Sequence, residues 1–257
     1  MSNNSYTSDW DVYFCYIEDM PAFMSVDLGI APVAPLADKP TLLEIVVGLQ
    51  TIAENGFPGN EEWEMLEEIE DAVVSTLEAK IEAVFVGKTL SNGMRSFYFY
   101  TGETLLFEQT MEAVIAEFPQ YRIAYQMQPD EEWNIYQDLL YPDEESLQKI
   151  YNNRILKNLE EQGDQPFIPR TITHWIYFST KEDREAFSAI AKGEGYSVRL
   201  EEEIEDQPGK PYKFVLHKED KADEVTINEI TLKLKEMAEQ YNGEYDGWET
   251  EAITEYS

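Results

Sequence analysis

Carboxylates supply most of the chemistry that this sequence could perform. Its 257 residues include 52 Asp and Glu against 19 Lys and Arg, which gives a formal net charge of −33. Paired carboxylates act as general acid and base in many enzymes, and clusters of them bind Ca²⁺. In a chain so rich in carboxylates such pairs arise from composition alone, so they mark no site. Between residues 61 and 71, for example, carboxylates at helical spacing predict a solvated helix face: Glu61, Glu64, Glu68 and Asp71.

Other catalytic and metal-binding patterns are absent from the sequence. His174 and His217 lie in different predicted strands, and the single Cys15 is far from both, so no zinc spacing is formed. The acidic stretch at 130–145 lacks the alternating ligands and central glycine of an EF-hand loop. No Gly-x-Ser-x-Gly elbow, Gly-x-Gly-x-x-Gly turn or P-loop occurs. We therefore expect no catalytic residue, no metal site and no cofactor. An unrecognised carboxylate-dependent enzyme is the alternative from a different class.

The charge also bounds the partners. Residues 1–142 hold 25 Asp and Glu against 5 Lys and Arg, a net of −20, and residues 143–257 hold 27 against 14, a net of −13. Binding to a phosphate backbone needs cations that release counterions, and anionic membranes repel an acidic surface. We therefore expect no direct nucleic-acid contact, no membrane contact, and a basic protein partner attracted by the long-range field of the chain. Solubility alone would also explain the charge.

Three features favour a cytoplasmic protein. No run approaches the roughly 18 apolar residues of a membrane span. The first residues, MSNNSYTSDWDVYF, lack the basic and apolar regions of a secretory signal. One cysteine cannot form an internal disulfide framework.

The hydrophobic pattern of residues 41–128 predicts the order β-α-β-β-α-β. Apolar residues at spacings of three and four indicate a helix over 61–80, and Asn92-Gly93 is a strong two-residue hairpin signal. A β-hairpin over 10–30 precedes this unit. The remaining predicted elements are strands at 41–50, 80–90, 94–102 and 121–128 and a helix at 103–118.

Residues 143–257 predict one helix followed by the same order. The helix spans 143–163, and Thr180 and Asp183 resemble a capping box at the start of another. The other predicted elements are strands at 171–178, 195–205, 210–219 and 244–253, helices at 181–193 and 223–242, and a turn at 206–209. Such split β-α-β units form ferredoxin-like sandwiches. The predicted fold class is α+β, with two tandem ferredoxin-like sandwiches with antiparallel sheets, the first preceded by an extra β-hairpin.

The stretch at 129–148 joins the two units, and its sequence favours a packed hinge over an active site. Asp130 would cap a short helical turn that carries Trp133. Pro142 suits the start of the next helix, whose first turn holds the acidic residues 143–145. The predicted apolar anchors of the stretch at 129–148 are Trp133, Tyr136, Leu139, Leu140 and Tyr141. We place the domain boundary here, giving an acidic α+β domain at 1–142 and a second domain at 143–257.

Four segments within residues 150–253 carry a family resemblance: RILKNLEEQGDQPFIPRTITHWIYF, GYSVRLE, YKFVLHKED and GEYDGWETEAI. Through them the second half resembles the family of the regulator of ribonuclease E activity B, a ribonuclease E inhibitor. The resemblance implies an acidic ferredoxin-like adaptor that binds a ribonuclease without chemistry of its own. Through EWEMLEEIED, VFVGKTLSNGMRSFYFY and DEEWNIYQDLLYP, the first half resembles a bacterial domain of unknown function found beside such domains. That resemblance implies no activity.

The leading interpretation is a non-enzymatic acidic protein-binding module that regulates or inhibits an RNA-processing ribonuclease. The alternative of the same physical class is an immunity or nucleic-acid-mimic protein that neutralises a basic partner. The contact is expected on exposed acids of the second domain, and the candidate partner-binding residues are Glu201, Glu202, Glu203, Asp246 and Glu249. Alternation along a strand sends neighbouring glutamates to opposite faces. The same residues could instead keep an edge strand soluble.

Overall fold

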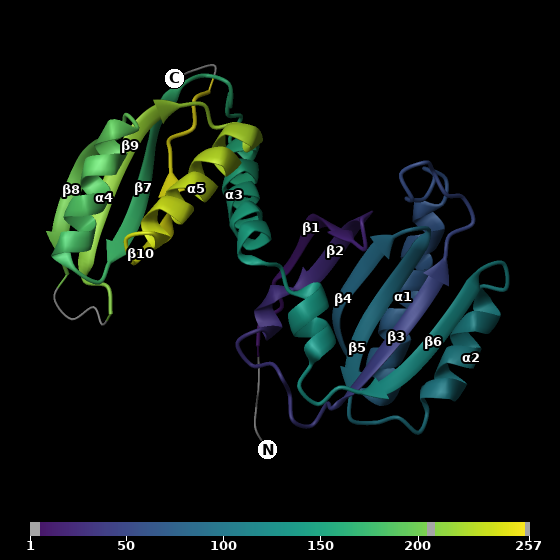
Figure 1. Cartoon of the computed structure of the whole chain (residues 1–257). Helices are drawn as coiled ribbons and strands as arrows, with labels where there is room; N and C mark the ends of the chain where they lie inside the picture. Colours follow the sequence, from purple (N-terminus) through teal and green to yellow (C-terminus); the bar gives the residue numbers. More distant parts are fainter. Residues whose placement is uncertain (1–5, 205–208, 255–257) are drawn as a thin grey trace. The chain divides into compact units, whose positions relative to one another are not determined.

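The structure, a computed structural model, describes residues 6–204 and 209–254. It divides into two compact units, Met1–Asp143 and Glu144–Ser257. Figure 1 colours them from purple to teal and from teal to yellow. Residues 206–208 of the predicted turn at 206–209 lie outside the described residues. Within the described ranges, no helix is long and apolar enough to cross a membrane.

The first unit is built on a six-stranded antiparallel sheet in the order β1-β2-β4-β5-β3-β6. Its last four strands have the ferredoxin-like order, and the extra hairpin extends the β4 edge. The strands are β1 (Trp10–Ile17), β2 (Met20–Asp27), β3 (Thr41–Gly48), β4 (Val84–Ser91), β5 (Met94–Thr101) and β6 (Arg122–Pro129). The helices are η1 (Leu28–Ile30), α1 (Trp63–Ile81), α2 (Phe107–Glu117) and the π-helix η2 (Ile135–Leu140).

Turn chemistry fixes both hairpins of this sheet. Asn92 and Gly93 join β4 to β5 with φ of 48° and 72°, as a type I′ turn requires. Glu18 and Asp19 join β1 to β2 with φ of 49° and 67°. Asn92-Gly93 therefore predicts a hairpin because both residues adopt the positive φ that this turn needs.

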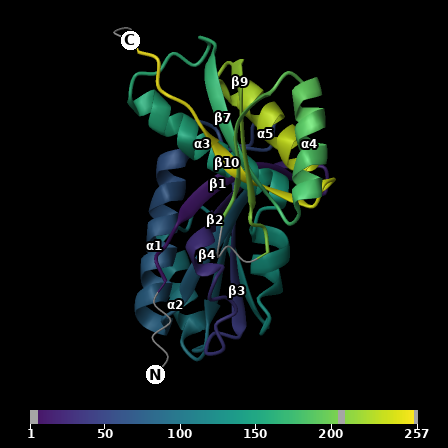
Figure 2. The same ribbon diagram turned by 90° about the vertical axis from the view of Figure 1, so that its left-hand side faces the viewer.

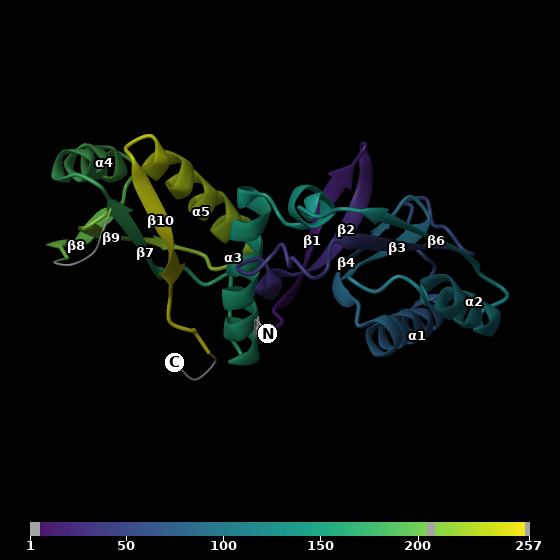
Figure 3. The same cartoon turned by 90° about the horizontal axis from the view of Figure 1, so that it is seen from below.

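The core of the first unit lies between the sheet and one layer of two helices. Figure 2 and Figure 3 place α1 and α2 on the same side of the sheet. Alternate residues of β3 and β5 face them, including Ile45 and Phe99, and both are fully buried. On α1 the predicted apolar positions Leu66, Ile69, Val73 and Leu77 are also buried. Trp63 differs, because it stands in the first turn of α1 and keeps 39% of its surface exposed.

The opposite face of this sheet is covered by the chain that follows β6. Trp133, Tyr136 and Leu140 are all buried to within 1%. The Asp130 carboxylate accepts hydrogen bonds from the amides of Asn134 and Ile135, so it caps the turn before η2. The cap at Asp130 is therefore found, and three of the five predicted anchors are buried, whereas Leu139 and Tyr141 are half-buried. Trp133 itself precedes the helix, with a left-handed φ of 57°, instead of lying on it.

The second unit is a four-stranded antiparallel sheet in the order β10-β7-β9-β8, again the ferredoxin-like order. Its strands are β7 (Arg170–Phe178), β8 (Ser197–Glu203), β9 (Tyr212–Asp220) and β10 (Gly243–Glu249). Its helices are α3 (Glu144–Glu161), α4 (Lys181–Gly193) and α5 (Glu224–Glu239). The predicted fold class, two tandem ferredoxin-like sandwiches, is confirmed.

Side-chain caps start two of these helices. The Thr180 hydroxyl accepts the Asp183 amide 3.1 Å away, as the capping box predicted. Asp223 accepts the Thr226 amide and starts α5. Both caps satisfy amides that the first helical turn leaves without intrahelical partners.

Candidate functional site

The second sheet has a helix side and an open side. Figure 3 places α4 and α5 on the same side of the sheet. On β7 the residues Ile172, His174, Ile176 and Phe178 are completely buried on that side. Alternation therefore turns Trp175 and Tyr177 to the open side, where both are half-buried. Of the aromatic run HWIYF, these are the two residues that the open face presents.

The register of neighbouring strands places the candidate acids on this frame. Glu202 lies opposite Lys213 on β9, which lies opposite Tyr177 on β7, so Glu202 shares the open face. On β10, Glu249 lies opposite Thr173, also on the open face. Asp246 occupies the bulge between Tyr245 and Gly247 and is exposed. Burial and the charges of Asp246 and Glu202 together raise the pKa of Tyr177.

The remaining two candidates point away from that face. Glu201 reaches the helix side, where its Oε2 lies 3.6 Å from Nη2 of Arg184 on α4. Glu203, two residues on, shares that side by alternation. The structure therefore brings Glu202, Asp246 and Glu249 to one face and sends Glu201 and Glu203 to the other. Even the first three are divided, because β8 and β10 are the opposite edges of the sheet.

The open face resembles a protein-binding surface in its composition. Two half-buried aromatic residues, Trp175 and Tyr177, stand near its centre, with carboxylates on both edge strands. Interfaces commonly combine an aromatic centre with a polar rim. Cations are also present, because Lys213 lies between Tyr177 and Glu202 and the Arg199 guanidinium donates to Thr173 Oγ1 over 3.4 Å. The candidate residues predicted from the sequence were all acidic, so they did not include the aromatic centre, Trp175 and Tyr177.

The tryptophan of the distinctive DGWE segment has a structural role. Trp248 is 5% exposed, and its Nε1 donates to Oδ1 of Asn152 on α3 over 2.9 Å. Asn152 Nδ2 donates in turn to Asn228 and Thr231 on α5, at 2.8 and 2.7 Å. This buried network joins β10, α3 and α5. It fixes the strand on which Asp246 and Glu249 stand.

His174 is a second buried polar residue without a sign of catalysis. It is fully buried, its Nδ1 lies 2.9 Å from the Tyr245 hydroxyl, and burial lowers its pKa to about 3. The imidazole is therefore neutral at physiological pH. Among the described residues, no group of three or more His, Cys, Asp or Glu could hold a metal ion.

Among the described residues, the carboxyl groups whose pKa is shifted all have it lowered. In Glu62, Asp130 and Asp223 burial acts to raise the pKa, but hydrogen bonds outweigh it and hold the pKa below its usual range. For Glu194 the hydrogen bond and charge of Lys233 lower the pKa. A carboxyl group that acts as general acid at neutral pH needs the opposite shift. These four groups are therefore suited to structural roles.

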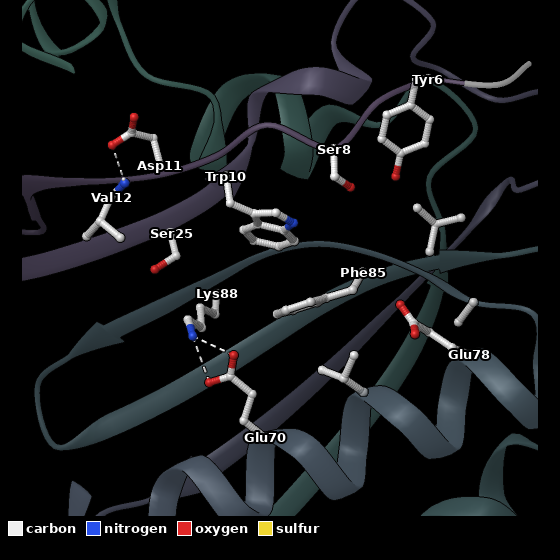
Figure 4. Close-up of a pocket in the computed structure, with 13 residues that line it drawn as sticks. Tyr6, Ser8, Trp10, Asp11, Val12, Ser25, Glu70, Glu78, Phe85 and Lys88 are labelled. Atoms are coloured by element: carbon white, nitrogen blue, oxygen red, sulfur yellow. Dashed lines mark hydrogen bonds and ion pairs between the residues drawn. The ribbon is translucent and has the colours of Figure 1, made fainter. Parts of the chain in front are cut away.

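A cavity of about 590 Å³ lies in the first unit, between α1 and the β1–β2 hairpin. Figure 4 shows Trp10 packed beside Phe85, with ring centroids 4.9 Å apart, and Lys88 paired with Glu70. Its carboxylates do not converge on one point, since Glu70 is paired and Glu78 stands on the exposed rim. The cavity is a groove beside α1, lined by both apolar and charged side chains.

Family models match the two units separately. Residues 8–141 match a family of unknown function (DUF695), and residues 149–250 match regulator of ribonuclease activity B. Both resemblances drawn from the sequence are thereby confirmed. No curated protein matches the chain.

Two solved structures are similar over most of their length. An unknown protein from Galdieria sulphuraria is 9% identical, covers 84% of this chain and 99% of its own, and has a TM-score of 0.23. A candidate glycine cleavage system transcriptional repressor is 7% identical, covers 82% of this chain and 98% of its own, and has a TM-score of 0.25.

Proposed function

Given that the chain belongs to the family of unknown function DUF695 and that its second half matches regulator of ribonuclease activity B, we propose that it is a non-enzymatic acidic protein that binds a ribonuclease and restrains it. The ribonuclease would present a basic surface, because the chain carries a net charge of −33. RNA itself would not be bound directly. The proposal places both proteins in the cytoplasm.

One observation carries the proposed docking surface. The open face of the second sheet presents Trp175 and Tyr177 between an acidic residue of β8, Glu202, and acidic residues of β10, Asp246 and Glu249. The aromatic rings supply apolar contact area for a partner, and the edge carboxylates steer its cations. The alternative of an enzyme gains no support from the four carboxyl groups with lowered pKa.

The proposal is tested by measuring how fast a lysate of the native host cleaves a labelled RNA when the purified chain is added. We expect the cleavage rate to fall with added chain, and less so as salt rises, because exposed charge pairs are screened beyond about 8–10 Å. Affinity purification with mass spectrometry should recover the same ribonuclease. An unchanged cleavage rate over all chain concentrations would refute the proposal.

Two variants locate the surface. Glu202→Lys with Asp246→Lys reverses charge on the open face and should weaken the restraint by about tenfold or more. The control variant, Glu108→Lys with Glu112→Lys on α2, changes the net charge by the same amount at two exposed residues of the first unit. It should leave the restraint within about twofold of the parent chain. Equal loss in both variants would mean that only the overall charge matters.

A further inference from the structure

The β1–β2 hairpin carries a row of apolar side chains on the helix side of the first sheet. Val12 lies opposite Ser25, and Ser25 lies opposite Lys88, whose ammonium reaches Glu70 on α1. These residues therefore point to the side where α1 lies. By alternation the same side of the hairpin presents the apolar stripe, which is Trp10, Val12, Phe14, Tyr16 and Phe23.

The apolar stripe is unusually exposed for such residues. The exposed fractions of these five side chains run from 40% for Trp10 to 69% for Tyr16. Contiguous exposed apolar patches on soluble proteins commonly mark interaction sites. The opposite side of the hairpin differs, since Ala22, Met24 and Val26 of β2 are buried there.

The space over the stripe has the width of one helix. α1 lies over β4, where Glu70 holds Lys88, and β2 and β1 come next in the sheet. Strands are about 4.8 Å apart, so β1 lies about 10 Å from β4. Packed helices are separated by about 8–10 Å. A helix beside α1 would therefore rest on the stripe and fill the groove shown in Figure 4.

The charge of the groove selects the occupant. The edge of α1 that borders it carries Glu67, Glu70 and Glu78, and both Glu67 and Glu78 are exposed. Lys88 does not make the groove cationic. It and Arg95 share the carboxylate of Glu70, and the single positive charge that these three residues retain is outweighed by the carboxylates of Glu67 and Glu78. With a net charge of −20 over residues 1–142, the surroundings favour a cationic ligand and oppose an anionic one.

We infer that this groove binds an amphipathic basic helix of a partner protein, with the apolar side of the helix on the stripe and its Lys or Arg residues against Glu67 and Glu78. Helix-in-groove binding of this kind uses apolar anchors at helical spacing. The inference rests on the proposed function in taking a basic protein as partner. It gives the first unit a binding role of its own.

The test uses the full chain and a designed helical peptide of about 14 residues, which spans about 21 Å. The peptide carries Leu on one side and Lys on the other, and its counterpart carries Glu in place of Lys. Titration calorimetry at about 50 mM and about 300 mM salt should show that the Lys peptide binds, more weakly at the higher salt, and that the Glu peptide does not. Absence of binding by the Lys peptide at the lower salt would overturn the inference.

Matched variants separate the groove from the overall charge. Glu67→Lys with Glu78→Lys should weaken the affinity for the Lys peptide by about tenfold or more. Glu108→Lys with Glu112→Lys on α2 should change that affinity by less than about twofold. Phe14→Ser with Tyr16→Ser should abolish binding, whereas Leu105→Ser, which alters a side chain 89% exposed, should not. Equal effects of the two charge variants, or full binding by the Phe14 and Tyr16 variant, would refute the groove as the site.

Two further readouts separate the groove from a dimer interface and from the surface that restrains the ribonuclease. If sedimentation shows that the chain alone forms a dimer that Phe14→Ser with Tyr16→Ser dissociates, a second copy covers the stripe and the inference is wrong. Restraint of the ribonuclease is measured without the peptide. Failure of that restraint while the peptide still binds would refute only the proposed function, and the reverse result would refute only the inference.

Discussion

The indole of Trp133 lies flat on the ring of Tyr100, with centroids 4.0 Å apart and planes inclined by 9°. The Tyr100 hydroxyl donates to Asp130 over 2.6 Å, and Trp133 Nε1 donates to the Lys39 carbonyl over 2.9 Å. The segment after β6 is thereby fastened to the second face of the first sheet. The aromatic residues of this acidic stretch are therefore packed into the first unit, whereas its acids Glu131, Glu132 and Asp138 stay exposed.

Trp133→Ala should therefore destabilise the first unit strongly. Removing a fully buried Trp typically costs about 3–5 kcal/mol, through lost burial and the cavity left behind. The free energy of unfolding, measured by urea denaturation with circular dichroism, checks the value. Trp63→Ala is the control, because that indole is 39% exposed and should lose less than about half as much. Similar losses in both variants would contradict the packed role of Trp133.

Asn152→Ala should destabilise the second unit by about 3 kcal/mol. The change would leave Trp248 Nε1 without its acceptor and remove the donor to Asn228 and Thr231, and buried polar groups without partners cost about 1–3 kcal/mol each. The neighbouring Asn153→Ala is the matched control, because Asn153 is exposed. It should stay within about 0.5 kcal/mol of the parent chain in the same urea experiment. A loss in Asn153→Ala as large as in Asn152→Ala would place the cause in the helix instead of the network.

Much of the fold could be predicted because local chemistry determined it. Asn92-Gly93 supplies the positive φ values of a tight hairpin, and Thr180 supplies an acceptor for a helix start. The candidate site depended on long-range order that no short segment encodes. Alternation indicates that Glu202 and Glu203 face opposite sides, but the sheet order decides that β8 and β10 are opposite edges. The exposure of the apolar stripe likewise depends on long-range order, because α1 lies over β4 and leaves the neighbouring strands β2 and β1 uncovered on that side.

The buried imidazole of His174 predicts a pH dependence of stability. Its pKa in the folded chain is about 3, below the ordinary value of 6.5, so the unfolded chain binds the proton more readily. Stability from the neutral imidazole is therefore present above pH 6.5 and is lost as the pH falls towards 3, by about 1.4 kcal/mol per pH unit. Urea unfolding of the second unit at pH 7, about 6 and about 5 measures this loss. His174→Asn should flatten the dependence above pH 5, and an unchanged slope would assign it to other groups.

The pKa of the Tyr177 hydroxyl tests whether acids from both edge strands of the open face lie near it. Burial and the charges of Asp246 and Glu202 raise the pKa of Tyr177, although these acids stand on opposite edge strands. Replacing Asp246 and Glu202 by Gln removes both negative charges, so the phenolate costs less and the pKa of Tyr177 should fall. NMR titration of ¹³C-labelled tyrosine, with the Tyr177 signal identified by Tyr177→Phe, measures the shift. Glu203 points to the helix side, so Glu203→Gln should leave the pKa of Tyr177 unchanged. If Glu203→Gln lowered the pKa as much, the acids of β8 would not be divided between the two faces, and the proposed docking surface would lose its acidic edge on that strand.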